Sequence, residues 1–147
     1  MNPRLRVIPI YLVAVAFAVV LGTIIQTQFN LAALQALGAD IGVLVRLRAT
    51  GQDLLGFTPA YAAIVSLTLL LALPMAALLA RLLPQWRLPL YFFAGGVGLL
   101  VAFQVANAVA PMPTLIAATR TAVGSAAMIL SGAFGALLFA TLMRPRS

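Results

Sequence analysis

Residues 60–80 read AYAAIVSLTLLLALPMAALLA and contain no charged side chain. The run has the length, about 20 residues, that an α-helix needs to cross roughly 30 Å of hydrocarbon. Three further runs have the same character: Val7–Ile25, Leu88–Ala110 and Thr121–Met143. The sequence therefore predicts an all-α integral membrane protein, a bundle of four transmembrane helices. We place the spans in one domain, at about 7–28, 59–82, 88–110 and 118–143.

Composition supports this class. Of the 147 residues, 64% are hydrophobic and 7% are charged, whereas soluble domains carry about 25% charged residues. All nine basic residues are arginine, a usage that we attribute to a GC-rich bacterial genome. The net charge of +7 does not indicate a nucleic-acid surface, because the arginines stand in ones and twos at the edges of apolar runs. There they suit lipid headgroups.

The arginines also predict the orientation in the membrane. With four spans, six arginines fall on one side (Arg4, Arg6, Arg81, Arg87, Arg144, Arg146) and three on the other (Arg46, Arg48, Arg120). Short loops with more arginine stay in the cytoplasm. We therefore expect a multi-pass protein of the bacterial inner membrane with both termini cytoplasmic. The aromatic residues near the span ends are expected to anchor the helices at headgroup level: Trp86, Tyr91, Tyr11 and Tyr61.

The first connection, from about Gln26 to Pro59, is long and partly apolar. Gly38 resembles a helix stop, and Asp40 is a suitable N-cap for a following helix. We expect the first helix to continue past the membrane surface, or to break before a short extra helix near Asp40–Thr50. Such a helix would lie in the outer loop, at the interface or over the bundle.

Several chemistries lack the residues that they require. Histidine, cysteine and lysine are absent, and the two acids, Asp40 and Asp53, lie in the first connection. Haem, zinc and di-iron sites need His, Cys or carboxylate clusters, and a nucleophilic serine needs a base. We expect a protein that is not an enzyme and that carries neither a metal nor another cofactor.

Polar residues gather at the predicted periplasmic end. This polar cap consists of Gln26, Gln28, Asn30, Asp40, Asp53, Gln104, Asn107 and Arg120. Gln104 and Asn107 are three residues apart and share a helix face. Either they bond to Gln26, Gln28 or Arg120 and lock the bundle, with Arg120 also paired to Asp40 or Asp53, or the cap forms a pocket or partner surface.

Small residues recur at four-residue spacing in two spans. They are Gly98, Ala102 and Ala106 in the third span, and Ser131, Gly132 and Gly135 in the fourth. Since lipid is as apolar as leucine, close packing through small residues is what holds membrane helices together. These rows serve packing within one chain or a contact with another subunit or a second copy.

Three functions are compatible with this pattern. The first is a non-catalytic accessory, assembly or scaffold subunit that binds other membrane proteins, or itself, through the small-residue faces and the polar cap. The second is a small oligomeric channel or carrier for an uncharged or anionic solute. The third is a protein that binds a lipid, a quinone or another hydrophobic ligand.

Overall fold

The computed structural model describes residues 2–38, 40–56, 58–109 and 122–144, without the side chains of residues 3, 53, 107 and 122. Within these ranges the chain is helical and has no strand. The elements are α1 (Pro3–Ala36), α2 (Val43–Gly56), α3 (Thr58–Leu82), the 3₁₀ turn η1 (Pro84–Trp86), α4 (Arg87–Val109) and α5 (Ala122–Leu142). Of the helices described, four are long and apolar enough to cross a membrane: α1, α3, α4 and α5. The expected start of the last span, near residue 118, lies outside the description.

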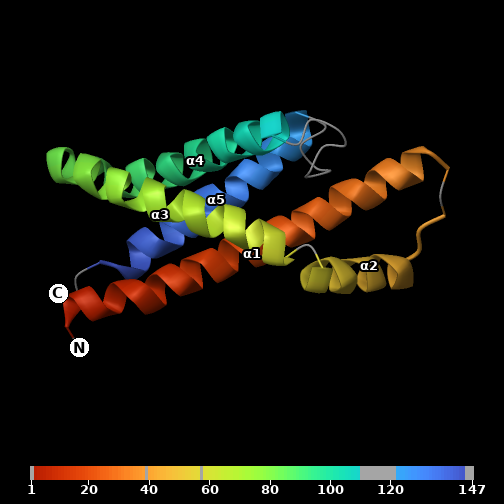
Figure 1. Cartoon of the computed structure of the whole chain (residues 1–147), viewed down its shortest axis with the longest axis horizontal. Coiled ribbons are helices and arrows are strands. Elements are labelled where there is room, and N and C mark those ends of the chain that lie inside the picture. The colour runs from red at the N-terminus through yellow and green to blue at the C-terminus, as the bar shows by residue number, and fades with distance from the viewer. Residues whose placement is uncertain (1, 39, 57, 110–121, 145–147) are drawn as a thin grey trace.

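The four long helices form a ring. α5 packs against α4 and α1, and α3 packs against the same two helices from the other side. A turn as short as η1 places the two helices that it connects side by side, so α3 and α4 are antiparallel neighbours. Both termini and η1 lie at one end of the bundle, and α2 lies at the other (Figure 1). We call the first the arginine end, after Arg4, Arg6, Arg81, Arg87 and Arg144, and the second the α2 end.

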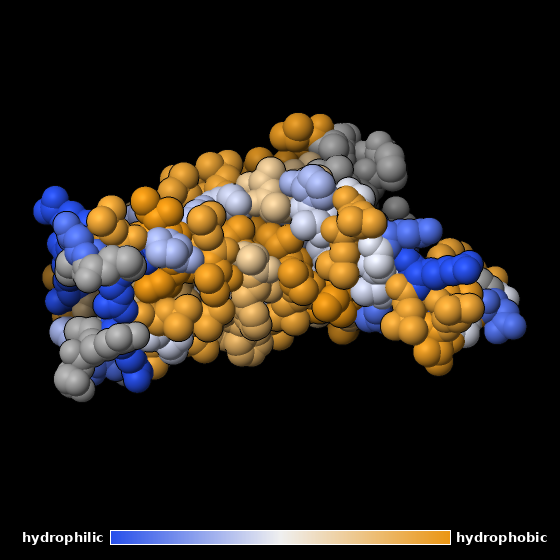
Figure 2. Space-filling model, turned by 90° about the horizontal axis from the view of Figure 1, so that it is seen from below, coloured by the Kyte–Doolittle hydropathy of each residue, from blue (hydrophilic) through white to orange (hydrophobic). Residues whose placement is uncertain are grey.

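The centre of the ring is filled by large side chains. Tyr61, Val65, Leu69, Leu99 and Met128 are fully buried there. Elsewhere the apolar side chains face outward, and Figure 2 shows them as a belt between two ends where hydrophilic residues gather. An apolar belt of this kind is the surface that a bilayer covers.

Small residues set the closest helix contacts. A Cβ added to Gly95 of α4 would meet the backbone oxygen of Gly132 of α5, and one added to Gly135 would lie 2.8 Å from Cβ of Ala18 in α1. Backbones that approach so closely gain dispersion contacts that longer side chains would prevent. The α4–α5 and α1–α5 interfaces therefore depend on glycine at these positions.

α1 is longer than a membrane requires. Its 34 residues span about 51 Å, and it continues to Ala36, past the expected end of the span near residue 28. Asn2 caps its start by accepting a hydrogen bond from the Arg4 amide at 3.1 Å. Gly38, with φ of 97°, follows its end, as the sequence predicts for a left-handed helix stop. The chain then returns through α2, which packs against the last part of α1 (Figure 1).

Candidate functional site

A cluster of buried polar side chains lies inside the bundle. Its members are Thr23, Gln26 and Thr27 of α1, Tyr61 of α3 and Ser131 of α5. Oγ of Ser131 donates to the Met128 carbonyl at 2.6 Å, so the 2.7 Å contact between Tyr61 and Ser131 uses the proton of Tyr61. Among the side chains that the structure describes, no buried nitrogen or oxygen lacks a hydrogen-bond partner. Oγ1 of Thr23 lies 3.4 Å from Oγ1 of Thr58 at the start of α3, so polar contacts join α1 to α3 and α3 to α5.

The position of Tyr61 corrects the sequence expectation. We expected this ring at headgroup level, but it is fully buried. Gly22 of α1 provides the space, because a Cβ there would overlap the Tyr61 ring. Ser131 offers a polar partner for the hydroxyl within the core, which removes the reason for the ring to reach water. Tyr11 also turns inward, where its hydroxyl donates to the Ser66 carbonyl, whereas Trp86 is exposed as expected.

Removal of the Tyr61 hydroxyl tests the role of this cluster. We expect Tyr61→Phe to lower the free energy of unfolding by about 1 kcal/mol, because one buried hydrogen bond is lost. The measurement is a double-mutant cycle with Ser131→Ala, read from reversible unfolding in mixed micelles. A coupling of about 0.6 kcal/mol or more is expected, and strictly additive effects would contradict a direct bond.

A second polar network joins α1 to α2. Arg46 of α2 donates from Nη1 to Oε1 of Gln28 and from Nη2 to Oε1 of Gln35, both at 2.8 Å. Nε2 of Gln28 lies 3.3 Å from Oγ1 of Thr50, and that hydroxyl donates to the Arg46 carbonyl at 2.8 Å. Arg46 was expected from the sequence only to contribute to the orientation in the membrane. The missed pattern is the seven-residue spacing of Gln28 and Gln35, which places both on one face of a continuing helix.

The described residues of the predicted polar cap differ in burial and in hydrogen-bond partners. Gln26 is buried, and Gln28 is bonded to Arg46 and Thr50 instead of to α4. Asn30, Asp40 and Gln104 are exposed. Arg120 and the side chains of Asp53 and Asn107 lie outside the description, so the pairings expected of them stay predictions.

The small residues fall into two groups. Ser131, Gly132 and Gly135 are buried and face neighbouring helices of the same chain: Gly132 faces Leu99 and Gly95, and Gly135 faces Ala18. Gly98 and Ala102 of α4 are half-buried and lie toward α3, where a Cβ added to Gly98 would lie 2.8 Å from Cγ2 of Thr68. The second group therefore packs against α3 and also borders open space on the outside of the bundle.

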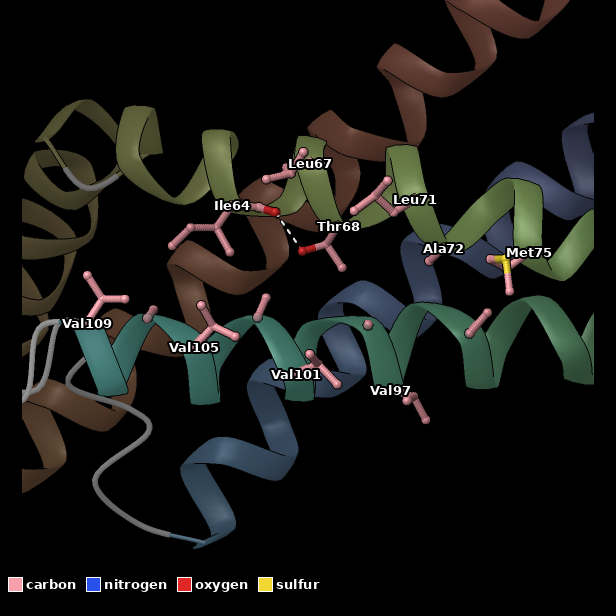
Figure 3. A pocket seen from close by; sticks show the side chains of 14 residues that line it. Ile64, Leu67, Thr68, Leu71, Ala72, Met75, Val97, Val101, Val105 and Val109 are labelled. Carbon is pink, nitrogen blue, oxygen red and sulfur yellow. Dashed lines mark hydrogen bonds between the residues drawn. The ribbon is translucent and has the colours of Figure 1, made fainter.

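That space is a groove between α3 and α4, with a volume of about 720 Å³. Small or half-buried side chains form its floor, at four-residue spacing on both helices: Thr68, Ala72, Ala94, Gly98, Ala102 and Ala106. More exposed branched or long side chains form its two walls: Leu67, Leu71 and Met75 on α3, and Val97, Val101 and Val105 on α4. Figure 3 shows Ile64 and Thr68 projecting toward α4, with Val105 and Val109 projecting back.

The lining of the groove is almost entirely apolar. Its hydroxyl, on Thr68, already donates to the Ile64 carbonyl at 2.7 Å, and the remaining lining is aliphatic apart from the thioether of Met75. An occupant therefore has to be apolar and needs no hydrogen-bonding group. Of this row, Gly98, Ala102 and Ala106 were predicted from the sequence, and Ala94 continues it at the same spacing.

Comparison of the chain with protein families, with curated protein sequences and with solved structures gave no match.

Proposed function

We propose that this chain is a non-catalytic accessory subunit of the bacterial inner membrane. Its groove between α3 and α4 would receive a membrane-spanning helix of another polypeptide. One observation carries the proposal: the small-residue row of α4 lines a groove on the outside of the bundle, whereas the row of α5 is buried within the bundle. In this proposal the arginine end faces the cytoplasm, in accordance with the excess of arginine there.

The shape of the groove favours a helix. The floor residues from Ala94 to Ala106 extend over about 18 Å of α4, more than half the thickness of the hydrocarbon core. Small side chains along this length permit close approach of a second backbone. The walls are parallel rows of side chains, into which the ridges of an incoming helix can interdigitate.

The rigidity of one wall favours a protein occupant further. Val97, Val101 and Val105 are β-branched and exposed, and valine in a helix has essentially one χ1 rotamer. This wall therefore loses little side-chain entropy when a partner packs on it. A flexible acyl chain gains no comparable advantage, because it must itself become ordered in the groove.

The groove dimensions also support a second candidate, a single apolar ligand such as an isoprenoid chain. The volume of about 720 Å³ lies within the usual 300–1,000 Å³ range of ligand pockets. The channel alternative receives no similar support, since Leu69, Leu99 and Met128 are fully buried at the centre of the ring.

Photocrosslinking in native membranes tests the proposal. A photoreactive amino acid at Val101, on the groove wall, is expected to give one discrete protein adduct, identified by mass spectrometry as crosslinked through a membrane span. Enlarging the floor with Ala102→Leu and Ala106→Leu is expected to reduce that adduct at least tenfold, because the leucines occupy the partner's volume. The matched control is Ala16→Leu, which adds the same atoms to an exposed position of α1.

The outcomes separate the candidates. An adduct that survives the two leucines would contradict docking in the groove. An adduct with lipid or an isoprenoid alone, lost in the filled variant, would contradict a protein partner and support the apolar ligand. An adduct with a second copy of the chain would replace the accessory role by self-association.

A further inference from the structure

We infer that the arginine end contains a binding site for a phosphate group, supplied by an anionic lipid. The site is a pocket of about 330 Å³ between the α3–α4 turn and the end of α5, lined by Pro84, Gln85, Arg87, Leu88, Pro89 and Arg144. It is separate from the groove, and the inference does not depend on what the groove binds.

Arg87 is held in place before any ligand arrives. Its Nη1 donates to the Ala140 carbonyl at 2.8 Å, and its guanidinium carbon lies 5.3 Å from the centre of the Tyr91 ring. The side chain is half-buried, so much of its conformational entropy is already lost in the unliganded protein. A guanidinium has five N–H donors, and a planar fork of this kind matches two phosphate oxygens at once.

The charges at this end have no carboxylate side chain to balance them. Both acids of the chain, Asp40 and Asp53, belong to the α1–α2 connection and to α2, which lies at the opposite end of the molecule (Figure 1). The carbonyls that end α5 offset part of the charge, since Arg6 bonds to Leu142 at 3.3 Å and Arg87 bonds to Ala140. Carbonyl groups carry only partial charges, so an external anion remains favourable.

Two further features point to a lipid phosphate. The pocket lies at the first turn of the 23-residue helix α4, where the positive end of the helix dipole favours an anion. Its rim includes Leu88 and Pro89, where α4 enters the apolar belt, and Trp86 beside it is 55% exposed. A phosphate at the arginines with acyl chains along α4 satisfies both the polar and the apolar parts of this surface.

Native mass spectrometry of the full chain, released from detergent, tests the site. The probes are phosphatidylglycerol, phosphatidylcholine and inorganic phosphate, each titrated separately. We expect phosphatidylglycerol to be retained at least tenfold better than phosphatidylcholine. Arg87→Gln with Arg144→Gln is expected to abolish this preference, whereas Arg4→Gln with Arg81→Gln, which removes the same charge from the same end, should preserve it.

Because Arg87 also caps α5, Arg144→Gln alone is measured as a second variant. Arg144 is exposed, so its loss leaves the helix contacts intact, and a reduced preference in a chain of unchanged thermal stability supports the site. Equal loss in both double variants would overturn the inference in favour of diffuse charge. Equal retention of the two lipids would overturn it outright. Displacement of phosphatidylglycerol by millimolar inorganic phosphate would assign the site to the free anion instead of the lipid.

Discussion

Replacement of Gly95 by leucine is expected to destabilise the bundle by about 3 kcal/mol or more, the upper range for overpacking. An added Cβ would lie 2.7 Å from Cβ of Ala136 and closer still to the backbone oxygen of Gly132. A side chain can rotate out of such a contact, but the backbone of α5 cannot. The two helices would have to separate along the interface that contributes most of the contacts of α4.

The measurement is reversible unfolding in mixed micelles, with the yield of monodisperse protein as a second readout. Gly51→Ala in α2 is the control, because nothing lies within 4 Å of a Cβ at that position. Alanine there is expected to be neutral or to stabilise the helix by about 0.5–1 kcal/mol, through the lower conformational entropy of the unfolded chain. Native-like stability of the Gly95 variant would show that α4 and α5 can repack at a larger distance.

The contrast between Gly95 and Gly98 shows where prediction from the sequence stops. Apolar runs of sufficient length predict the four long helices, because only a helix satisfies its own backbone in hydrocarbon. They do not show which face of each helix is inside, since the side facing lipid is as apolar as the side facing protein. Gly95 and Gly98 are both small residues in one span, yet Gly95 faces the backbone of α5, whereas Gly98 faces the Thr68 side chain of α3 and lines the outer groove.

The polar residues show the same limit of prediction from the sequence. Gln26 and Gln28 were assigned to one cap because both fall at the predicted periplasmic end of the first span, but they are about 200° apart around a helix. The structure accordingly buries Gln26 in the bundle and directs Gln28 toward Arg46. Tyr61 was assigned to the membrane surface from its position near a span end, whereas Gly22 and Ser131, distant in sequence, determine that it is buried. Local sequence patterns do not show which residues from distant segments of the chain contact each other.

Arg46 offers the second large effect, because it is the hub of the contact between α1 and α2. Its two hydrogen bonds reach Gln28 and Gln35, which lie two turns apart on α1. Arg46→Ala removes both and leaves Gln28 with Thr50 as its remaining partner across the interface. Hydrogen bonds from a charged donor contribute about 1.5–3 kcal/mol when shielded, and less here because Gln35 is exposed.

We therefore expect α2 to open locally, with a loss of amide protection of about tenfold, or about 1.4 kcal/mol, in Val43–Gly56. Hydrogen exchange in nanodiscs is the measurement, and protection in α3, α4 and α5 should not change, because the core contacts of the bundle do not involve α2. Arg48→Ala is the matched control, since Arg48 is an exposed arginine two residues further along the same helix. If both variants lose protection equally, net charge and not the Gln28–Arg46–Gln35 geometry holds α2 in place. If protection falls throughout the chain, α2 is an integral part of the bundle and not an appendage of α1.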